Sequence, residues 1–225
     1  MGKSLPLFPL NTVLFPGMVL PLHIFEERYR RLLAQRAGFD PVFGIVLITH
    51  GHEVAASEEL PKLAKVGTAV TLVASGQYPD GRSDIVVRGT RRFVVNDADW
   101  STGYPTADVD WLPEPATTGD EWEQIATFKT QLVSHFHAYV ADVRAITGAE
   151  EIALDLPEDP QALGWELAEL LPMTAPSRQL LLEATTLAQL LGDLVTHLRT
   201  ERSVLRNLGA AGSPSAHPGR GFSPN

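Results

Sequence analysis

Histidines supply the only residue pattern in this chain that suggests a metal site. Residues 50–53 (HGHE) place three potential ligands within four positions, but no further ligand stands at a spacing known for zinc proteins. His135 and His137 lie two residues apart in an expected helix, so their side chains point about 200° apart and do not share an ion. We interpret residues 50–53 as a solvated turn and predict no metal site.

Nucleophilic catalysis has even less support. Ser75-Gly76 lacks the rest of a Gly-x-Ser-x-Gly elbow, and no serine, lysine or histidine is spaced as a nucleophile with its base. The chain contains no cysteine, which excludes thiol catalysis, iron–sulfur clusters and cysteine zinc sites. We therefore predict no catalytic residue and no cofactor.

A basic cluster, Arg88, Arg91 and Arg92, lies in an expected strand and has two interpretations. An RNA-contacting strand would need stacking aromatic residues beside it. Here aspartates surround the cluster, which favours a solvated strand face with local ion pairs. The net charge of −9 also disfavours nucleic acid as a partner. RNA binding is kept as the alternative function.

Four large aromatic residues are candidates for binding another protein: Tyr78, Trp100, Tyr104 and Trp111. Aromatic side chains are enriched both at binding hot spots and in protein cores. The last three lie in a segment rich in proline and aspartate. There they either fill the boundary between two subdomains with buried side chains or form an exposed apolar surface for binding. As a hypothesis, all four line an apolar crease between these subdomains.

The elements that would position these residues change type near residue 118. Before it, short runs rich in valine, isoleucine and phenylalanine end at glycine, proline or aspartate, which is typical of strands and turns. One helix, around residues 25–36, interrupts them, and Pro79-Asp80-Gly81 predicts a turn. The expected strands are residues 5–7, 18–20, 42–48, 66–75, 84–95 and 104–111.

From residue 119 the apolar residues recur every three to four positions, which predicts helices. Asp120 with Glu123, Asp159 with Pro160, and Thr186 with Gln189 are expected to cap three helix starts. Residues 1–118 carry 11 basic and 13 acidic residues, whereas residues 119–208 carry 6 and 14. The acidity thus belongs to the helical part. We predict subdomains at 1–118 and 119–208 and a disordered tail at 209–225.

Several blocks along the chain resemble the N-terminal, substrate-binding domain of Lon proteases. They occur in the order of that family and together span about residues 4–208. The blocks are residues 5–26 (LPLFPLNTVLFPGMVLPLHIFE), 43–46 (FGIV), 66–68 (VGT), 79–81 (PDG), 87–93 (VRGTRRF), 170–173 (LLPM) and 178–183 (RQLLLE).

The resemblance implies an α+β fold in which a PUA-like β-domain, a pseudo-barrel with one inserted helix, precedes a helical bundle. It implies binding of unfolded or client protein segments, with a protease or chaperone as a further partner, and it transfers no catalytic residue. Only 17 residues follow residue 208, so we expect neither the ATPase nor the peptidase of full Lon proteases. No apolar run reaches membrane-span length, and no signal peptide is recognisable, so we expect a cytoplasmic protein without membrane contact.

Overall fold

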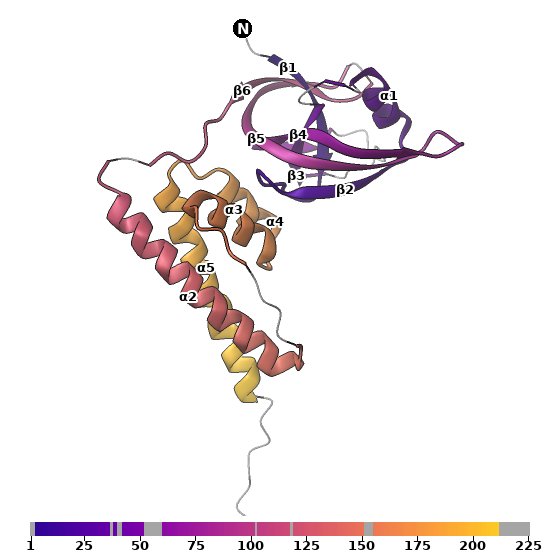
Figure 1. The fold of residues 1–225 in the computed structure, drawn as a ribbon. Coiled ribbons are helices and arrows are strands. Elements are labelled where there is room, and N and C mark those ends of the chain that lie inside the picture. Colours follow the sequence, from indigo (N-terminus) through magenta and orange to yellow (C-terminus); the bar gives the residue numbers. More distant parts are fainter. Residues whose placement is uncertain are drawn as a thin grey trace, which may run out of the picture.

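The computed structural model describes residues 3–36, 38–39, 42–51, 60–101, 103–117, 119–150 and 155–211. Six strands come first, with one helix among them, and four helices follow (Figure 1). The elements are β1 (Lys3–Leu10), β2 (Val19–Ile24), α1 (Glu27–Arg36), β3 (Phe43–His50), β4 (Lys62–Gln77), β5 (Ser83–Asp99), β6 (Thr106–Trp111), α2 (Trp122–Thr147), α3 (Pro160–Leu170), α4 (Ala175–Leu182) and α5 (Leu187–Ala211).

The strands form one curved sheet in the order β2-β5-β4-β3-β1-β6. All neighbours are antiparallel except β1 and β3. The long strand β5 pairs with β2 through its first half and with β6 through its second half, so the sheet curls until β6 lies against both β1 and β5. The predicted α+β class, with the β part first, is confirmed.

The helix inserted among the strands, α1, covers one part of the sheet. It buries Tyr29 and Leu32 against a cluster that includes Phe8, Phe43 and Ile85. The ring of Tyr29 stacks on Phe8 with 4.0 Å between centroids. The apolar spacing that predicted this helix is therefore the spacing that buries its inner face.

The other four helices form two layers. Figure 1 shows α2 and α5 as a long pair that extends away from the sheet, with α3 and α4 next to the sheet. Asp159 caps α3 by accepting a hydrogen bond from the Ala162 amide at 2.8 Å, and Thr186 accepts one from the Gln189 amide at 3.1 Å. Both predicted caps are confirmed. In the part of the chain that the structure describes, each helix is too short or too polar to cross a bilayer.

Two predictions about helix ends were wrong. The residue before α2 is Glu121, in helical backbone conformation and without a side-chain cap, so Asp120 does not start this helix. Helix α5 continues to Ala211, so the tail does not begin at 209. Residues 212–225 lie outside the described part. Helix α4, which has 8 residues and is capped by Thr174, was not predicted from the sequence.

One apolar core is shared by the sheet and the helices. It joins Leu7 and Phe15 from the β part to Leu132, Trp165 and Leu190 from the helices. The rings of Phe15 and Trp165 stack with 5.7 Å between centroids. The change from strands to helices falls between Trp111 and Trp122, near the expected boundary at residue 118, yet the two parts pack as neighbours around this core.

A buried arginine fastens the sheet to the helices. Arg92 on β5 is 1% exposed, and its Nη1 donates to the carbonyl oxygens of Leu182 and Ala184, both at 2.7 Å. Its Nη2 donates to the Pro113 carbonyl. Burial lowers the pKa of this guanidinium, while the nearby Glu114 carboxylate raises it. The interpretation of this strand as a solvated basic face is therefore wrong at Arg92.

Two further side chains repeat this pattern from the helical side. Arg178 on α4 donates to the Ala168 carbonyl at 3.0 Å, and its guanidinium lies 4.6 Å from the Phe15 ring centroid. Gln179 donates to the carbonyl of Val66 on β4 at 3.0 Å. Directional bonds to backbone atoms thus fix the helices against the sheet.

Candidate functional site

A groove with an apolar floor lies between α1 and the hairpin of β4 and β5. It encloses about 510 Å³, a volume suited to one or two side chains of a ligand. We call it the hairpin groove; it is lined by Glu27, Arg30, Arg31, Leu33, Ala34, Leu72, Ser75, Gly76, Gln77, Gly81, Ser83 and Ile85. Leucine and isoleucine side chains from three elements form its floor, and arginines from α1 stand at its rim.

The turn of the hairpin is held to α1. Gly81 has φ +85°, and its amide donates to the Tyr78 carbonyl at 2.9 Å, which closes the predicted Pro-Asp-Gly turn. Arg30 on α1 donates from Nη1 to the Asp80 carbonyl at 3.1 Å. Arg82 also bonds the Asp80 carboxylate, from Nε at 2.8 Å. The width of the hairpin groove therefore depends on exposed polar contacts, which open at low free-energy cost.

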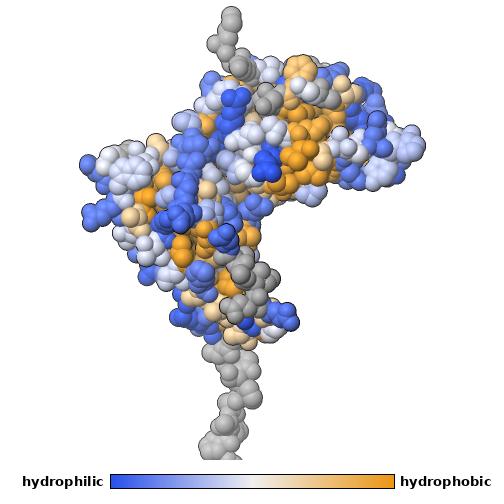
Figure 2. Space-filling view, in the orientation of Figure 1, coloured by the Kyte–Doolittle hydropathy of each residue, from blue (hydrophilic) through white to orange (hydrophobic). Residues whose placement is uncertain are grey.

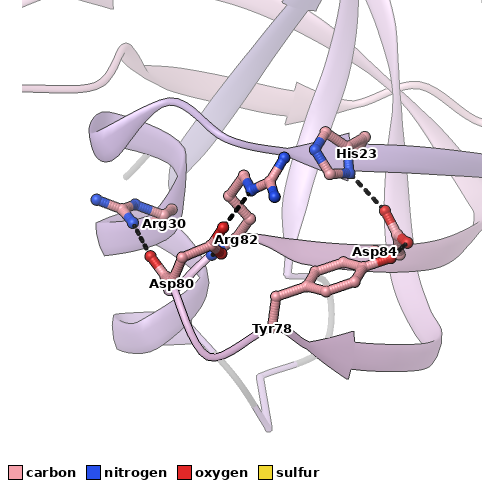
Figure 3. A network of polar contacts seen from close by, with 6 residues as sticks. All are labelled: His23, Arg30, Tyr78, Asp80, Arg82 and Asp84. Atoms are coloured by element: carbon pink, nitrogen blue, oxygen red, sulfur yellow. Dashed lines mark hydrogen bonds and ion pairs between the residues drawn. The ribbon is translucent and has the colours of Figure 1, made fainter.

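A second set of polar contacts lies beside this turn. Figure 3 shows Asp84 between His23 and Tyr78: His23 Nδ1 is 2.6 Å from Asp84 Oδ1, and the Tyr78 hydroxyl donates to Asp84 Oδ2. These bonds hold the pKa of Asp84 below its usual range, with Tyr78 the larger cause. The same bond raises the pKa of Tyr78. The set orders the turn.

Apolar surface continues next to the hairpin. Val73 on β4 is 52% exposed and Tyr78 is 44% exposed. A neighbouring hollow across β2 includes Pro21, Leu22 and Val86. Figure 2 shows hydrophobic surface gathered over part of the sheet, and hydrophobic and polar surface mixed over the helices. The hairpin groove thus belongs to a larger apolar face.

The outer strand of this face, β2, is a poor site for adding a further strand. It pairs with β5 on one side and ends the strand order of the sheet. Pro21 stands in its middle and supplies no amide hydrogen, a common means of blocking edge-to-edge pairing. A ligand is therefore expected to bind through side chains in the grooves.

A second groove follows the line where the sheet meets α3. It encloses about 630 Å³. We call it the acidic crease; it is lined by Pro16, Gly17, Met18, Thr90, Glu114, Asp159, Gln161, Ala162, Trp165, Glu166, Glu169 and Leu170. Glu114 Oε2 lies 3.2 Å from both Trp165 Nε1 and Gln161 Nε2, which donate to it.

The four predicted aromatic residues do not share one surface. Tyr78 lies at the hairpin turn, and Tyr104 packs near α1, where its hydroxyl donates to Gln35 Oε1 at 2.7 Å. Trp111 is partly buried against the shared core, with the Arg91 guanidinium 3.4 Å from its ring centroid. Trp100 is half-buried after the end of β5. Their part in binding stays a prediction, and a crease between sheet and helices does exist, but other residues line it.

The histidines considered above as metal ligands are not grouped in the described residues. His50 ends β3, whereas His52 and Glu53 lie outside the described residues. His135 contacts Arg202 at 3.2 Å, and burial lowers its pKa; His137 is exposed. Within the described ranges, no three histidine, aspartate or glutamate side chains come close enough to hold a metal ion.

The described part of the chain thus combines a curved sheet with a pair of long helices, and it carries the two grooves described above. The model of the ATP-dependent protease La (LON) substrate-binding domain matches residues 4–200. The chain belongs to this family.

Relatives and solved structures agree with that assignment. The Lon proteases of Brevibacillus choshinensis and Escherichia coli K12 are each 26% identical over 90% of this chain. The chain spans about a quarter of their length, 26% and 25% respectively. A Lon N-terminal domain protein from Xanthomonas campestris has a TM-score of 0.58 at 26% identity, covering 86% of this chain and 98% of that one. The N-terminal domain of Mycobacterium avium complex Lon protease has a TM-score of 0.60 at 18% identity, covering 88% of this chain and 98% of that one.

Most residues that line the two grooves were not predicted from the sequence. Leu33 and Leu72 resemble ordinary core positions in the sequence, because their partial exposure depends on how α1 and the hairpin meet. Glu166 and Glu169 belong to a helix whose charges looked like a solvated face. The accumulation of acidic residues after residue 119 was the one available signal for the acidic crease.

Proposed function

We propose that this chain is a non-catalytic module that binds exposed apolar segments of other proteins. The observation that carries the proposal is the hairpin groove. It has an apolar floor, encloses about 510 Å³ and lies beside exposed apolar residues. Unfolded segments present isolated leucine, valine and phenylalanine side chains, and burying one such side chain is worth about 1.5–3 kcal/mol. A groove of this size takes one or two of them.

The rim of the hairpin groove supports adaptable binding. Arg30 and Arg31 each pair with Glu27 across one or nearly one helical turn, so their charges are largely compensated. Their aliphatic stems can cover an apolar ligand while the guanidinium groups stay in water. Low sequence selectivity is what a module for unfolded clients requires.

The partners and the setting of this function are also part of the proposal. Membership of the Lon substrate-binding family supports protein segments as ligands. We infer that bound clients pass to an ATP-dependent protease or a chaperone in the cytoplasm. No catalytic step and no cofactor enters this scheme.

The test is binding of a permanently unfolded, reduced and alkylated model protein to the full chain. Ala34 is an exposed residue of α1 that lines the hairpin groove. Ala34→Glu fills the groove with a charged side chain without touching the core, and we expect binding to weaken roughly tenfold.

Ala141→Glu is the matched control, because Ala141 is an exposed alanine on α2, outside both grooves. This variant has the same net charge and is expected to bind as the wild type does. Equal binding by both variants and the wild type would show that the hairpin groove is not the client site.

A further inference from the structure

The acidic crease has a charge pattern that the proposed function does not use. Four carboxylate residues line it, Glu114, Asp159, Glu166 and Glu169, and its lining contains no lysine or arginine. Two of them are engaged: Glu114 accepts from Trp165 and Gln161, and Asp159 caps α3. Glu166 and Glu169 are the charges left for a ligand.

The positions of Glu166 and Glu169 are electrostatically unfavourable without a ligand. They are three residues apart on α3, so like charges face each other on one side of the helix. Glu169 lies in the last turn of α3, where the helix dipole is negative and basic residues are favoured, but this turn has none. Partial burial and the charge of Glu166 raise the pKa of Glu169, which is an exposed residue, while Arg178 lowers it.

Arg178 does not remove this imbalance. Its guanidinium is directed to backbone carbonyls, with Nη1 3.0 Å from the Ala168 oxygen and Nη2 3.4 Å from the Val13 oxygen. It also lies over the Phe15 ring. Arg178 also approaches the crease, with Nη1 3.5 Å from the Glu169 carbonyl oxygen and Nη2 3.6 Å from the Met18 sulfur. It therefore offsets part of the charge of Glu169, and a bound cation would offset more of the charge of the two glutamates.

Apolar side chains from two segments also line the crease. Met18 and Pro16 come from the turn before β2, where the Met18 amide donates to the Phe15 carbonyl at 3.2 Å. Trp165 and Leu170 come from α3, and Leu170 is 49% exposed. An aliphatic stem can lie along these side chains while its charged end reaches the two glutamates.

We propose that the acidic crease is a second binding surface, selective for protein segments in which lysine or arginine adjoins an apolar side chain. Charge complementarity carries the inference: Glu166 and Glu169, with no lysine or arginine among the lining residues, and the apolar side chains beside them fit a basic and hydrophobic segment. Acidic segments and nucleic acid phosphates are repelled. This surface is separate from the hairpin groove, and its selectivity differs from that of a site for neutral apolar segments.

The experiment is an NMR titration of the full chain with defined peptides. The probe is a capped peptide, Lys-Lys-Leu-Lys-Lys; its counterpart has glutamate in place of each lysine. The chain has four tryptophans, so the indole N–H of Trp165, which donates to Glu114 in the crease, is a local reporter. We expect the lysine peptide to shift this resonance, with affinity that falls as salt rises, and the exposed Trp122 on α2 to stay unchanged.

The decisive variant is Glu166→Gln with Glu169→Gln. Glutamine keeps the shape of both side chains, and removal of a like-charge pair is not expected to destabilise the fold. We expect the lysine peptide to bind about fivefold to tenfold more weakly. The control is Asp97→Asn with Asp108→Asn, an exposed cross-strand aspartate pair on β5 and β6 that changes net charge equally; it should bind as the wild type does.

Several outcomes overturn the proposal. These are equal binding of the glutamate peptide, unchanged affinity in the double glutamine variant, or a loss of affinity in the aspartate control as large as in that variant. Spermidine, a cation without an apolar side chain, must bind more weakly than the peptide; equal binding would exclude a role for the apolar floor. Ala34→Lys separates the two sites, because it fills the hairpin groove with a side chain that repels the lysine peptide. If it abolishes lysine-peptide binding, the peptide occupies the hairpin groove and the acidic crease is not its site.

Discussion

Arg92 and Arg30 each bond to the backbone of a distant segment, and they differ in their access to water. Arg92 is buried between the sheet and the helices and donates to three carbonyl oxygens. Arg30 lies at the edge of the hairpin groove, pairs with Glu27 and donates to the Asp80 carbonyl at 3.1 Å. The same donor type therefore serves two purposes. In the interior, loss of the arginine leaves the backbone carbonyl oxygens without a hydrogen-bond donor, because water does not reach them. At the surface, a water molecule takes the place of the lost donor.

This difference distinguishes two regions: the rigid contact between sheet and helices around Arg92, which we call the joint, and the adjustable hairpin groove around Arg30. Around Arg92, the shared core, Arg178 and Gln179 all fix the helices to the sheet. Around Arg30, the contacts that set the groove width are exposed ion pairs and one turn. A module that accepts many clients needs such a combination, because a stable frame allows one edge to adapt without loss of the fold.

The largest expected effect is that of Arg92→Met. The substitution keeps an apolar stem of similar length but leaves the carbonyls of Leu182, Ala184 and Pro113 buried without donors. We expect a loss of about 3 kcal/mol or more in the free energy of unfolding, measured by urea denaturation followed by circular dichroism. Arg30→Met, by comparison, should change it by less than about 1 kcal/mol. Equal losses would refute the contrast between joint and groove.

The strand β4 offers the same comparison within one element, through its glycines. A Cβ on Gly67 would lie 2.5 Å from both the Ile45 oxygen and the Phe93 ring, whereas a Cβ on Gly76 in the hairpin would meet nothing within 4 Å. Neither glycine has a positive φ.

Gly67→Ala should therefore destabilise the protein by about 1–3 kcal/mol through overpacking, while Gly76→Ala should stay within about 0.5 kcal/mol of the wild type. Thermal unfolding of the two variants checks this. If Gly67→Ala were tolerated, the sheet around Phe93 would be able to shift and make room for the methyl group, and the packing between sheet and helices would be less rigid than its contacts indicate.

The fold was predictable from the sequence because its signals are local. Strand-like runs, the Pro-Asp-Gly turn and the capping side chains Asp159 and Thr186 each act within a few residues. The end of α5 was misplaced because glycine and alanine at 209–211 continue a helix that the preceding leucines have already established. Asp120 failed as a cap because the helix starts after Glu121 instead.

The site was less predictable because it depends on contacts between distant segments. Arg92 meets the carbonyls of Leu182 and Ala184, 90 and 92 residues further along the chain, so a basic strand cluster could not be recognised as partly buried. The hairpin groove combines α1 with a hairpin about 40 residues later. Tyr78 was singled out only as a large aromatic residue, and its bond to Asp84 came from the turn geometry.

The smallest expected effect concerns this exposed bond and is a change in titration. Asp84→Asn replaces the carboxylate that raises the pKa of Tyr78. The pKa of Tyr78 should fall towards the ordinary value of a tyrosine, as followed by ultraviolet absorbance of the phenolate, with Tyr78→Phe subtracted to isolate this residue. The unfolding midpoint at neutral pH should stay close to that of the wild type, because both groups are exposed.

The pH dependence has a definite sign for each partner. The pKa of Tyr78 is raised on folding, so its contribution to stability is present at neutral pH and is lost as the pH rises through the folded pKa. The pKa of Asp84 is lowered on folding, so its contribution is lost as the pH falls through the folded pKa in the acid range. Asp84→Asn should flatten both changes together. If the variant instead unfolds readily at neutral pH, the hairpin turn is part of the rigid joint, and the adjustable edge of the groove must be sought elsewhere.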